Sequence, residues 1–422
     1  MDKTLPWYER VRYERERHGW SLEELAEKIA IDPKTLSRWE HNRSFPYPVH
    51  RQRLSEIFGE SVEALGLQGH NAMTRGQDIH PSATGTSWLQ DWGEAPRFEA
   101  IYGRDQEIAT LKQWVLDDEC RVVVLLGMGG VGKTTLAELV ARQIKDAFKY
   151  VFWRSLQNAP PVESILQSCI LLLSQQRQSD LPDTIDAQLA LLMDYLRNHR
   201  CLLVLDNVES VLQVGYRTGQ YREEYEGYGR LLQRIGQTEH RSCLMLTSRE
   251  KPREIARIEG NIGPVRSLLV SGIHQAGGQT ILQNQGLLGS DKDYADLVDL
   301  YTGNPLALKL VSEPIREVFG RDIASFLQEE KYVFGDIYDL LDQQFHRLSS
   351  QEQDIMYWLA IEREPLPLEL LWKNMDRLID KGSLFDALDS LRRRSMIEIS
   401  PPKRFTLQPV IMEYVTDDFV RQ

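Results

Sequence analysis

A glycine-rich segment, GMGGVGKTT at residues 127–135, has the composition of a phosphate-binding loop. It matches the pattern GxxxxGK[ST] and stands between an apolar run at 121–127 and a helical pattern at 135–148. In this context backbone N–H groups and the start of the helix point at negative charge, whereas a chance glycine-rich turn needs no such neighbours. The residues expected to contact phosphates are Gly127, Gly129, Gly130, Val131, Gly132, Lys133, Thr134 and Thr135.

A second polar position is expected to complete this site. Lys133 should reach the β and γ phosphates, and the Thr134 hydroxyl should bind Mg²⁺. Asp206 ends the apolar run CLLVLDN at 201–207, so its carboxylate would face the loop and hold the water shell of Mg²⁺. The alternative is a core strand that ends in an exposed capping aspartate. Thr134 and Asp206 are therefore candidate metal ligands, and Lys133 and Asp206 are candidate catalytic residues.

The position after Asp206 bears on the rate of hydrolysis. P-loop enzymes that hydrolyse nucleotides usually have a second acid there to orient water, whereas this chain has Asn207. An amide cannot accept a proton, so we predict slow hydrolysis unless Glu209 acts as the base. The same feature disfavours a motor ATPase that acts on nucleic acid.

The elements around these motifs predict a multidomain chain of the α/β plus α class. Five apolar runs alternate with helical patterns within residues 99–274, which predicts a five-stranded parallel sheet covered by helices on both faces. Residues 275–335 show helical patterns only. Residues 336–422 combine helices with two short strands around a PPKR turn, as in the wing of a winged helix.

The N-terminal part is expected to be a separate helical head. Residues 1–65 have the pattern of short helices, and residues 66–98 lose apolar periodicity and gather Gly, Pro, Ser and Thr, as a linker does. Ser21 and Glu24 form a capping box, and Pro33 opens the next helix. The predicted core of the head is Val11, Leu25, Ala26, Ile29, Ile31, Leu36, Trp39, Leu54 and Ile57.

Residues 98–422 resemble the NB-ARC type of signal-transduction ATPases with numerous domains (STAND), the type found in plant resistance proteins, apoptotic protease-activating factors and bacterial regulators. The motifs that carry the resemblance are IYGRD (101–105), GMGGVGKTT (127–135), LLVLDNVE (202–209), LMLTSRE (244–250) and GNPLALK (303–309). The resemblance implies that the chain binds ATP or ADP with Mg²⁺.

The resemblance also implies roles for single residues. Ile101, Tyr102 and Arg104 would line the adenine side of the site. Arg249 would be the sensor of the γ-phosphate, which suits its planar, permanently charged fork, although a surface arginine after a strand is the alternative. Pro305 would pack on the adenine or ribose, and it also suits the first turn of a helix.

The winged-helix block departs from the family at one motif. The family usually has Met-His-Asp where this chain has Leu407-Gln408-Pro409. Gln408 can donate one hydrogen bond to a phosphate but carries no charge that could switch. The arginines at 392–394 could suggest a second DNA site, but this block packs on the nucleotide subdomain in the family, which favours a structural or switch role.

Residues 7–60 resemble the helix-turn-helix of Cro and phage repressors (the XRE class), whose second motif helix enters the major groove. The resemblance implies DNA contacts from Lys34, Thr35, Ser37, Arg38 and Arg43. Residues 1–60 hold 11 basic and 11 acidic side chains, so a single head should bind DNA weakly. The alternative is that the same fold recruits a protein.

Composition excludes several other classes. The 422 residues carry 50 basic and 62 acidic side chains, a net charge of −12, so any DNA contact must be local. The 4 cysteines include no CxxC pair, which argues against a disulfide framework or a zinc site and suits a reducing cytosol. Apolar runs are much shorter than the roughly 18 residues that span a bilayer. We therefore expect a cytoplasmic protein without a membrane segment.

These features together predict a nucleotide-operated switch that ADP holds closed and ATP opens. Such modules often form homo-oligomers through their nucleotide domains, which would pair weak heads and raise their affinity for DNA. The alternative function is a signalling or defence scaffold whose head recruits a protein. Family members usually carry sensor repeats after the winged helix, so the sensor is expected to be a separate protein or to have been removed.

Overall fold

The structure is a computed structural model, and it falls into two compact units, Met1–Gly85 and Thr86–Gln422. It describes residues 6–29, 33–40, 46, 48–62, 64–67, 89–97, 101–175, 181–215, 219–329, 331–375, 380–394, 396–400 and 403–421. Among these residues, no helix has the length and apolar character needed to cross a membrane.

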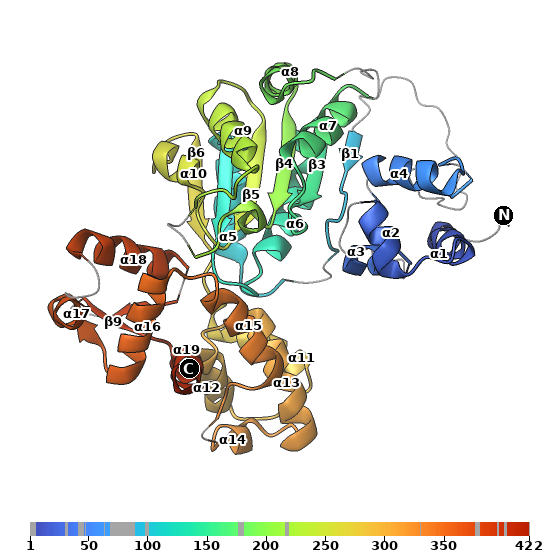
Figure 1. Ribbon diagram of the computed structural model, residues 1–422. Helices are drawn as coiled ribbons and strands as arrows, with labels where there is room; N and C mark the ends of the chain where they lie inside the picture. The colour runs from blue at the N-terminus through green and yellow to red at the C-terminus, as the bar shows by residue number, and fades with distance from the viewer. Residues whose placement is uncertain are drawn as a thin grey trace. The chain divides into compact units, whose positions relative to one another are not determined.

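The first unit is a small helical domain (Figure 1). Its helices are α1 (Trp7–Arg17), α2 (Leu22–Lys28), α3 (Pro33–Glu40) and α4 (Pro48–Phe58). The predicted capping box opens α2, because the Ser21 hydroxyl accepts from the Glu24 N–H and the Glu24 carboxylate accepts from the Ser21 N–H. Ile57 is half-buried and Ile31 lies outside the described residues. The other predicted core residues are buried: Val11, Leu25, Ala26, Ile29, Leu36, Trp39 and Leu54.

The second unit is built on a six-stranded parallel sheet in the order β1-β3-β4-β5-β2-β6. The strands are β1 (Leu89–Asp91), β2 (Val122–Leu126), β3 (Tyr150–Ser155), β4 (Cys201–Asp206), β5 (Cys243–Ser248) and β6 (Val265–Leu269). The prediction of five strands is therefore wrong by one. The extra strand, β1, lies in the segment expected to be a linker, and it pairs with β3 at the sheet edge. Three residues are too few to show an apolar period, so this strand could not be predicted from the sequence pattern.

Helices cover both faces of this sheet (Figure 1). One face packs against α5 (Asp105–Lys112), the π-helical turn η1 (Gln113–Asp117) and α6 (Lys133–Ile144). The other face packs against α7 (Val162–Leu173), α8 (Ile185–Asn198) and α9 (Glu226–Gln237). Short helices η2 (Lys145–Ala147), η3 (Val208–Val211) and α10 (Arg253–Ile258) complete this part, which we call the sheet domain. Burial on both faces explains why the strands have continuous apolar runs.

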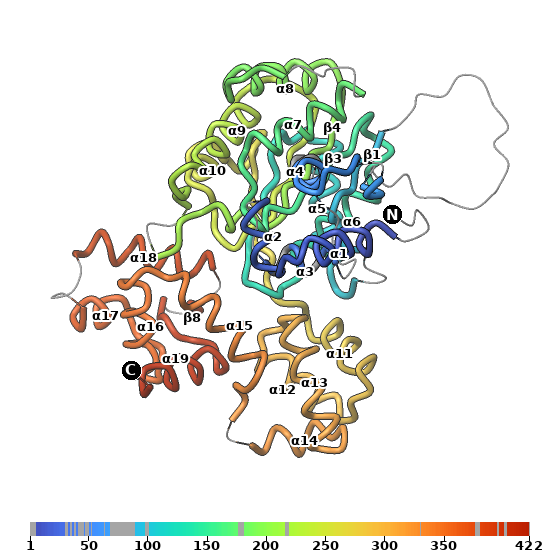
Figure 2. Tube along the Cα trace, turned by 45° about the vertical axis from the view of Figure 1, so that its right-hand side comes forward, coloured from blue at the N-terminus to red at the C-terminus, as the bar shows by residue number. Residues whose placement is uncertain are grey.

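Two further blocks follow the sheet domain, and Figure 2 shows them as separate groups of helices. The helical block contains α11 (Gln275–Asn284), α12 (Asp291–Leu300), α13 (Pro305–Val318) and α14 (Ile323–Phe326). The winged-helix block contains α15 (Gly335–Phe345), α16 (Ser350–Glu362), α17 (Leu368–Met375), α18 (Lys381–Arg393) and α19 (Pro409–Arg421), with strands β7 (Leu366–Pro367), β8 (Glu398–Ser400) and β9 (Arg404–Thr406). The antiparallel pair β8–β9 matches the two strands predicted around the PPKR turn.

Candidate nucleotide-binding site

The glycine-rich segment forms a loop between β2 and α6, as the motif predicted. Gly130 and Gly132 have φ angles of 81° and 96°, a left-handed conformation that costs glycine little and other residues more. Gly132 is the N-cap of α6, whose first residue is Lys133. The loop therefore brings backbone N–H groups and the helix N-terminus to one place, an arrangement that attracts anions.

Lys133 is buried inside this loop. Its Nζ donates hydrogen bonds to the carbonyl oxygens of Gly127 and Met128 at 2.9 and 3.0 Å. Burial lowers the pKa of Lys133 to about 8, and the neighbouring carboxylates of Glu209 and Asp206 offset part of that effect. The ammonium group thus lies within the loop. Among the described residues, it is bonded directly only by carbonyl oxygens of the loop.

Thr134 and Asp206 lie side by side, although they are 72 positions apart in sequence. The Thr134 hydroxyl donates to Asp206 Oδ1 at 2.8 Å, and the Thr247 hydroxyl bonds the same oxygen. Burial raises the pKa of Asp206, and these two hydrogen bonds oppose the rise. Asp206 is only 3% exposed, so it is not the exposed capping residue of the alternative interpretation.

The Thr134 hydroxyl and the Asp206 carboxylate are oxygen groups of the kind that bind Mg²⁺. The described residues contain no group of three or more His, Cys, Asp or Glu side chains that could hold a metal by itself. This donor set fits Mg²⁺, which usually takes one or two protein ligands and fills its other positions with water and phosphate oxygens.

Glu209 is engaged with Arg249 rather than free to act as a base. Arg249 Nε lies 3.2 Å from Glu209 Oε1, and the Arg249 backbone N–H donates to Glu209 Oε2 at 3.2 Å. Asn207, the residue after Asp206, adopts a left-handed conformation with φ of 61°. Its side-chain amide donates to Asp206 Oδ2 at 3.1 Å. Neither position is therefore a free base: Asn207 is an amide, and the Glu209 carboxylate is paired with Arg249.

We expect Asn207→Asp to raise the rate of ATP hydrolysis by about tenfold or more, because a carboxylate can accept the proton of an attacking water. The wild type should turn over well below the roughly 10 s⁻¹ median of enzymes. Aspartate tolerates the left-handed conformation that Asn207 adopts, so the backbone should be retained. The measurement is phosphate release at saturating ATP and Mg²⁺, with Asn207→Ala as the control. A wild-type rate of tens per second would show that another residue, such as Glu209, is the base.

The helical block is bonded directly to the loop. Asn304 caps α13 by accepting from the N–H groups of Leu306 and Ala307, and its Nδ2 donates to the Gly129 carbonyl at 2.9 Å. The Leu306 N–H also donates to the Gly130 carbonyl at 3.3 Å. Pro305, between them, occupies the first turn of α13, which its fixed φ suits. The GNPL motif is therefore placed against the P-loop.

The IYGRD motif lies beside the same loop. Arg104 is 3% exposed, and its Nη2 donates to the carbonyls of Val131 at 3.0 Å and Ser271 at 2.6 Å. Tyr102 accepts at its hydroxyl from Asn284 Nδ2 at 3.1 Å, while Ile101 is half-buried against the core around α5 and α6. Arg104 therefore ties the loop to the segment after β6, and the contact of these residues with adenine stays a prediction.

Gln344, on α15 of the winged-helix block, reaches the loop as well. Its Oε1 accepts from the Gly129 N–H at 3.3 Å, and the side chain is 6% exposed. Gln408, which the sequence singled out, lines a small cavity with Met128 and Asn304 instead. A single glutamine in a helical pattern carries no motif, so Gln344 could not be identified from the sequence.

A buried ionic group joins the winged-helix block to the end of β5, and we call it the Glu250 cluster. The Glu250 carboxylate is 1% exposed and lies 2.9 Å from Arg347 Nε and 3.3 Å from Arg394 Nη1. Arg347 Nη2 also donates to the Glu209 carbonyl at 2.8 Å. Arg394 belongs to the arginine run at 392–394, which supports the structural role favoured for that run.

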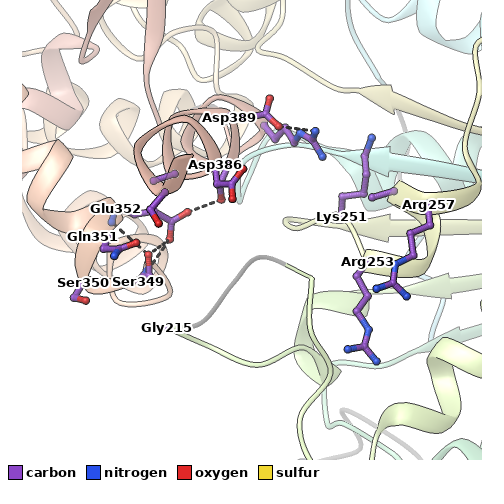
Figure 3. A pocket seen from close by; sticks show the side chains of 15 residues that line it. Gly215, Lys251, Arg253, Arg257, Ser349, Ser350, Gln351, Glu352, Asp386 and Asp389 are labelled. Atoms are coloured by element: carbon purple, nitrogen blue, oxygen red, sulfur yellow. Dashed lines mark hydrogen bonds and ion pairs between the residues drawn. The ribbon is translucent and has the colours of Figure 1, made fainter. Parts of the chain in front are cut away.

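A charged cleft of about 550 Å³ runs beside the Glu250 cluster (Figure 3). On the sheet-domain side it is lined by the cations Lys251, Arg253 and Arg257. On the winged-helix side it is lined by the acids Glu352, Asp386 and Asp389 and by the serines that open α16. Glu352 also lies 3.8 Å from Arg394 Nε, so the cluster borders the cleft. Arg393 also lines the winged-helix side and pairs there with Asp389, so that wall carries charges of both signs.

The predicted DNA-contact residues lie mostly on α3, which carries Lys34, Thr35, Ser37 and Arg38. Ser37 is half-buried, whereas the side chains of the other three and all of Arg43 lie outside the described residues. Two other cations of the head are used internally. Arg15 donates to both carboxylate oxygens of Glu40 at 2.6 and 2.9 Å, and Arg53 Nη1 donates to the Ile29 carbonyl at 3.0 Å.

Comparison with known proteins agrees with these motifs. Residues 104–260 match the NB-ARC domain family, and residues 8–71 match a helix-turn-helix domain family. An uncharacterized WD repeat-containing protein of Nostoc sp. is 44% identical over an alignment of 446 residues, which covers 98% of this chain and 35% of that protein. The regulatory protein AfsR of Streptomyces coelicolor is 34% identical over 194 residues, 45% of this chain and 18% of that protein.

A solved structure has a similar arrangement of elements. It is a STAND protein with a tetratricopeptide repeat sensor from Pyrococcus horikoshii, 19% identical, with a TM-score of 0.41 over 78% of this chain and 44% of that one. This chain spans 35% and 18% of the lengths of the Nostoc and Streptomyces relatives. An NB-ARC domain implies nucleotide binding. The chain therefore carries an NB-ARC domain at residues 104–260, preceded in sequence by a helix-turn-helix domain at residues 8–71.

Proposed function

We propose that the chain is a molecular switch operated by ADP and ATP. The observation that carries this proposal is that one loop residue, Gly129, is bonded to both following blocks. Its carbonyl accepts from Asn304 of the helical block, and its N–H donates to Gln344 of the winged-helix block. A phosphate that accepts from the Gly129 N–H must therefore compete with Gln344, and the Asn304 contact holds the same residue to the helical block, which couples binding to the arrangement of the blocks.

In this switch, Lys133 binds the β and γ phosphates, and Arg249 contacts the γ-phosphate. Thr134 and Asp206 hold Mg²⁺, which supplies positive charge to the phosphates. Arg249 must leave Glu209 to reach the γ-phosphate, because the two are ion-paired at 3.2 Å. Slow hydrolysis suits this role, because the ATP-bound conformation then persists long enough to act on a partner.

We further propose that the helix-turn-helix head binds DNA when two or more heads are brought together. The head has no net charge over residues 1–60, and Arg15 and Arg53 are bonded within it, so a single copy holds few cations for phosphates. Homo-oligomers that form in ATP would supply the missing affinity. The relative AfsR is named a regulatory protein, and a regulatory role is consistent with this proposal.

The remaining parts of the proposal concern location and sensing. The 4 cysteines are free and buried, which suits a reducing cytoplasm, and we place the protein there. The Nostoc relative is described as containing WD repeats. Repeats of this kind, in a longer chain or in a separate protein, would supply the sensor.

The proposed function predicts sequence-specific DNA selection that depends on nucleotide. We expect the full chain to enrich a common sequence from genomic fragments in ATP but not in ADP. Lys34→Ala with Arg38→Ala should eliminate the enrichment, because each base contact contributes about 1–3 kcal/mol. The matched control is Arg12→Ala with Lys28→Ala, which removes two exposed cations from α1 and α2 instead. If neither nucleotide gives an enriched sequence, the scaffold function is favoured.

A further inference from the structure

Gln344 connects the winged-helix block to a loop donor that a phosphate would also use. Its Oε1 accepts from the Gly129 N–H at 3.3 Å, and its Nε2 donates to the Leu340 carbonyl of the same helix at 3.0 Å. The second bond determines which end of the amide faces the loop. Gln344 is 6% exposed, so bulk water replaces neither bond easily.

Gly129 lies at the part of the loop that Arg249 faces. A Cβ atom added to Gly129 would be 3.2 Å from Arg249 Cζ, so the guanidinium lies directly against this residue. Lys133, in contrast, bonds the carbonyls of Gly127 and Met128. If Arg249 contacts the γ-phosphate, as the proposed function has it, the Gly129 N–H is a donor at the γ-phosphate rather than at the inner phosphates.

We propose that Gln344 makes the site discriminate between ADP and ATP, an inference that rests on the proposed function. A γ-phosphate oxygen that accepts from the Gly129 N–H competes with the Gln344 oxygen for one hydrogen. The anionic phosphate also repels that oxygen, which carries partial negative charge. ATP therefore displaces Gln344 from the loop, whereas ADP leaves its hydrogen bond in place.

The displacement would reach the Glu250 cluster because Arg347 lies in the turn that follows α15, where its backbone N–H donates to the Gln344 carbonyl at 3.2 Å. Arg347 bonds both the Glu250 carboxylate and the Glu209 carbonyl. Glu209 is in turn the ion-pair partner of Arg249. ATP would remove Gln344 from Gly129 and draw Arg249 away from Glu209. Gln344 and Glu209 are both neighbours of Arg347, so the contacts of Arg347 that attach the winged-helix block to the sheet domain would be weakened.

The test compares affinities for Mg²⁺-ADP and for a non-hydrolysable Mg²⁺-ATP analogue by calorimetry on the full chain. Gln344→Ala should raise the affinity for the ATP analogue relative to ADP roughly fivefold, because the competing acceptor is gone. Gln344→Glu should lower it roughly tenfold, because a carboxylate binds the N–H more tightly and repels the γ-phosphate. Gln343→Ala changes an exposed glutamine next to it and should leave the ratio unaltered.

The outcomes separate this inference from the proposed function. The inference is wrong if the wild type binds both nucleotides but both Gln344 variants keep the wild-type ratio of affinities for the ATP analogue and ADP. A loss of ATP affinity in Gln344→Ala would also overturn it, since Gln344 would then be a donor to the phosphate. A wild type that binds neither nucleotide would overturn the proposed function itself. Gln344→Met, which keeps the side-chain length, serves if the alanine variant does not fold.

Discussion

Lys133→Ala abolishes the binding of ADP and ATP and leaves the fold intact. The expected loss is at least about 100-fold, because hydrogen bonds from a charged group to phosphates contribute roughly 1.5–3 kcal/mol each. The fold should survive since Lys133 bonds only the carbonyls of its own loop among the described residues, and alanine suits the first turn of α6. Calorimetry measures binding, and circular dichroism melting verifies the fold.

The pH dependence of binding gives a second readout of the same residue. Lys133 has a pKa of about 8 without nucleotide, and phosphates would raise it. Below pH 8 the side chain is charged in both states, so affinity is constant. Above pH 8 binding must take up a proton, so affinity should fall up to about tenfold per pH unit. Lys309→Ala, at an exposed lysine of α13, is the control. Undiminished affinity in Lys133→Ala would mean that the loop is not the nucleotide site.

The sequence predicted the parts of the site that depend on local order. The P-loop needs glycines at fixed offsets between a strand and a helix, and the strand that ends in Asp206 shows as an apolar run followed by an acid. These two signals together placed Thr134 beside Asp206, which lie in hydrogen-bond contact. The parallel sheet carries such information, because β2 and β4, with β5 between them, both end at the same edge of the sheet.

The contacts between blocks could not be predicted in the same way. Gln344 and Gly129 are 215 positions apart, and their hydrogen bond depends on how α15 packs against the sheet domain. The Glu250 cluster likewise joins residues 97 and 144 positions apart, each of which lies just after the end of an element: β5, α15 and α18. No pattern within a helix distinguishes a glutamine or arginine that will be buried at such a contact from one that faces water. The edge strand β1 was missed because tertiary pairing with β3, rather than apolar periodicity, forms it.

The second large effect is expected at the Glu250 cluster, where Glu250→Ala should release the winged-helix block from the sheet domain. The change leaves Arg347 and Arg394 without the carboxylate that pairs with both, in a region where Arg394 is 8% exposed. Removing one partner of a buried ion pair typically costs about 3–5 kcal/mol, because the remaining charge is desolvated and unpaired. We expect a lower melting temperature and faster ADP dissociation, measured by fluorescence of a labelled nucleotide.

Variants of the partners distinguish an ionic attachment from simple loss of packing. Arg392→Ala is the matched control, because Arg392 is half-exposed and, among the described residues, bonds only Asp389 of its own helix. It should change stability by no more than about 0.5 kcal/mol. Adding Arg394→Ala to Glu250→Ala should restore part of the lost stability, because it removes a buried charge whose remaining carboxylate neighbour, Glu352, lies 3.8 Å from its Nε. Suppose instead that the double variant loses, relative to Glu250→Ala, the same unfolding free energy that Arg394→Ala loses relative to the wild type. The two side chains then act independently. The Glu250–Arg394 pair would then not be what holds the winged-helix block in place.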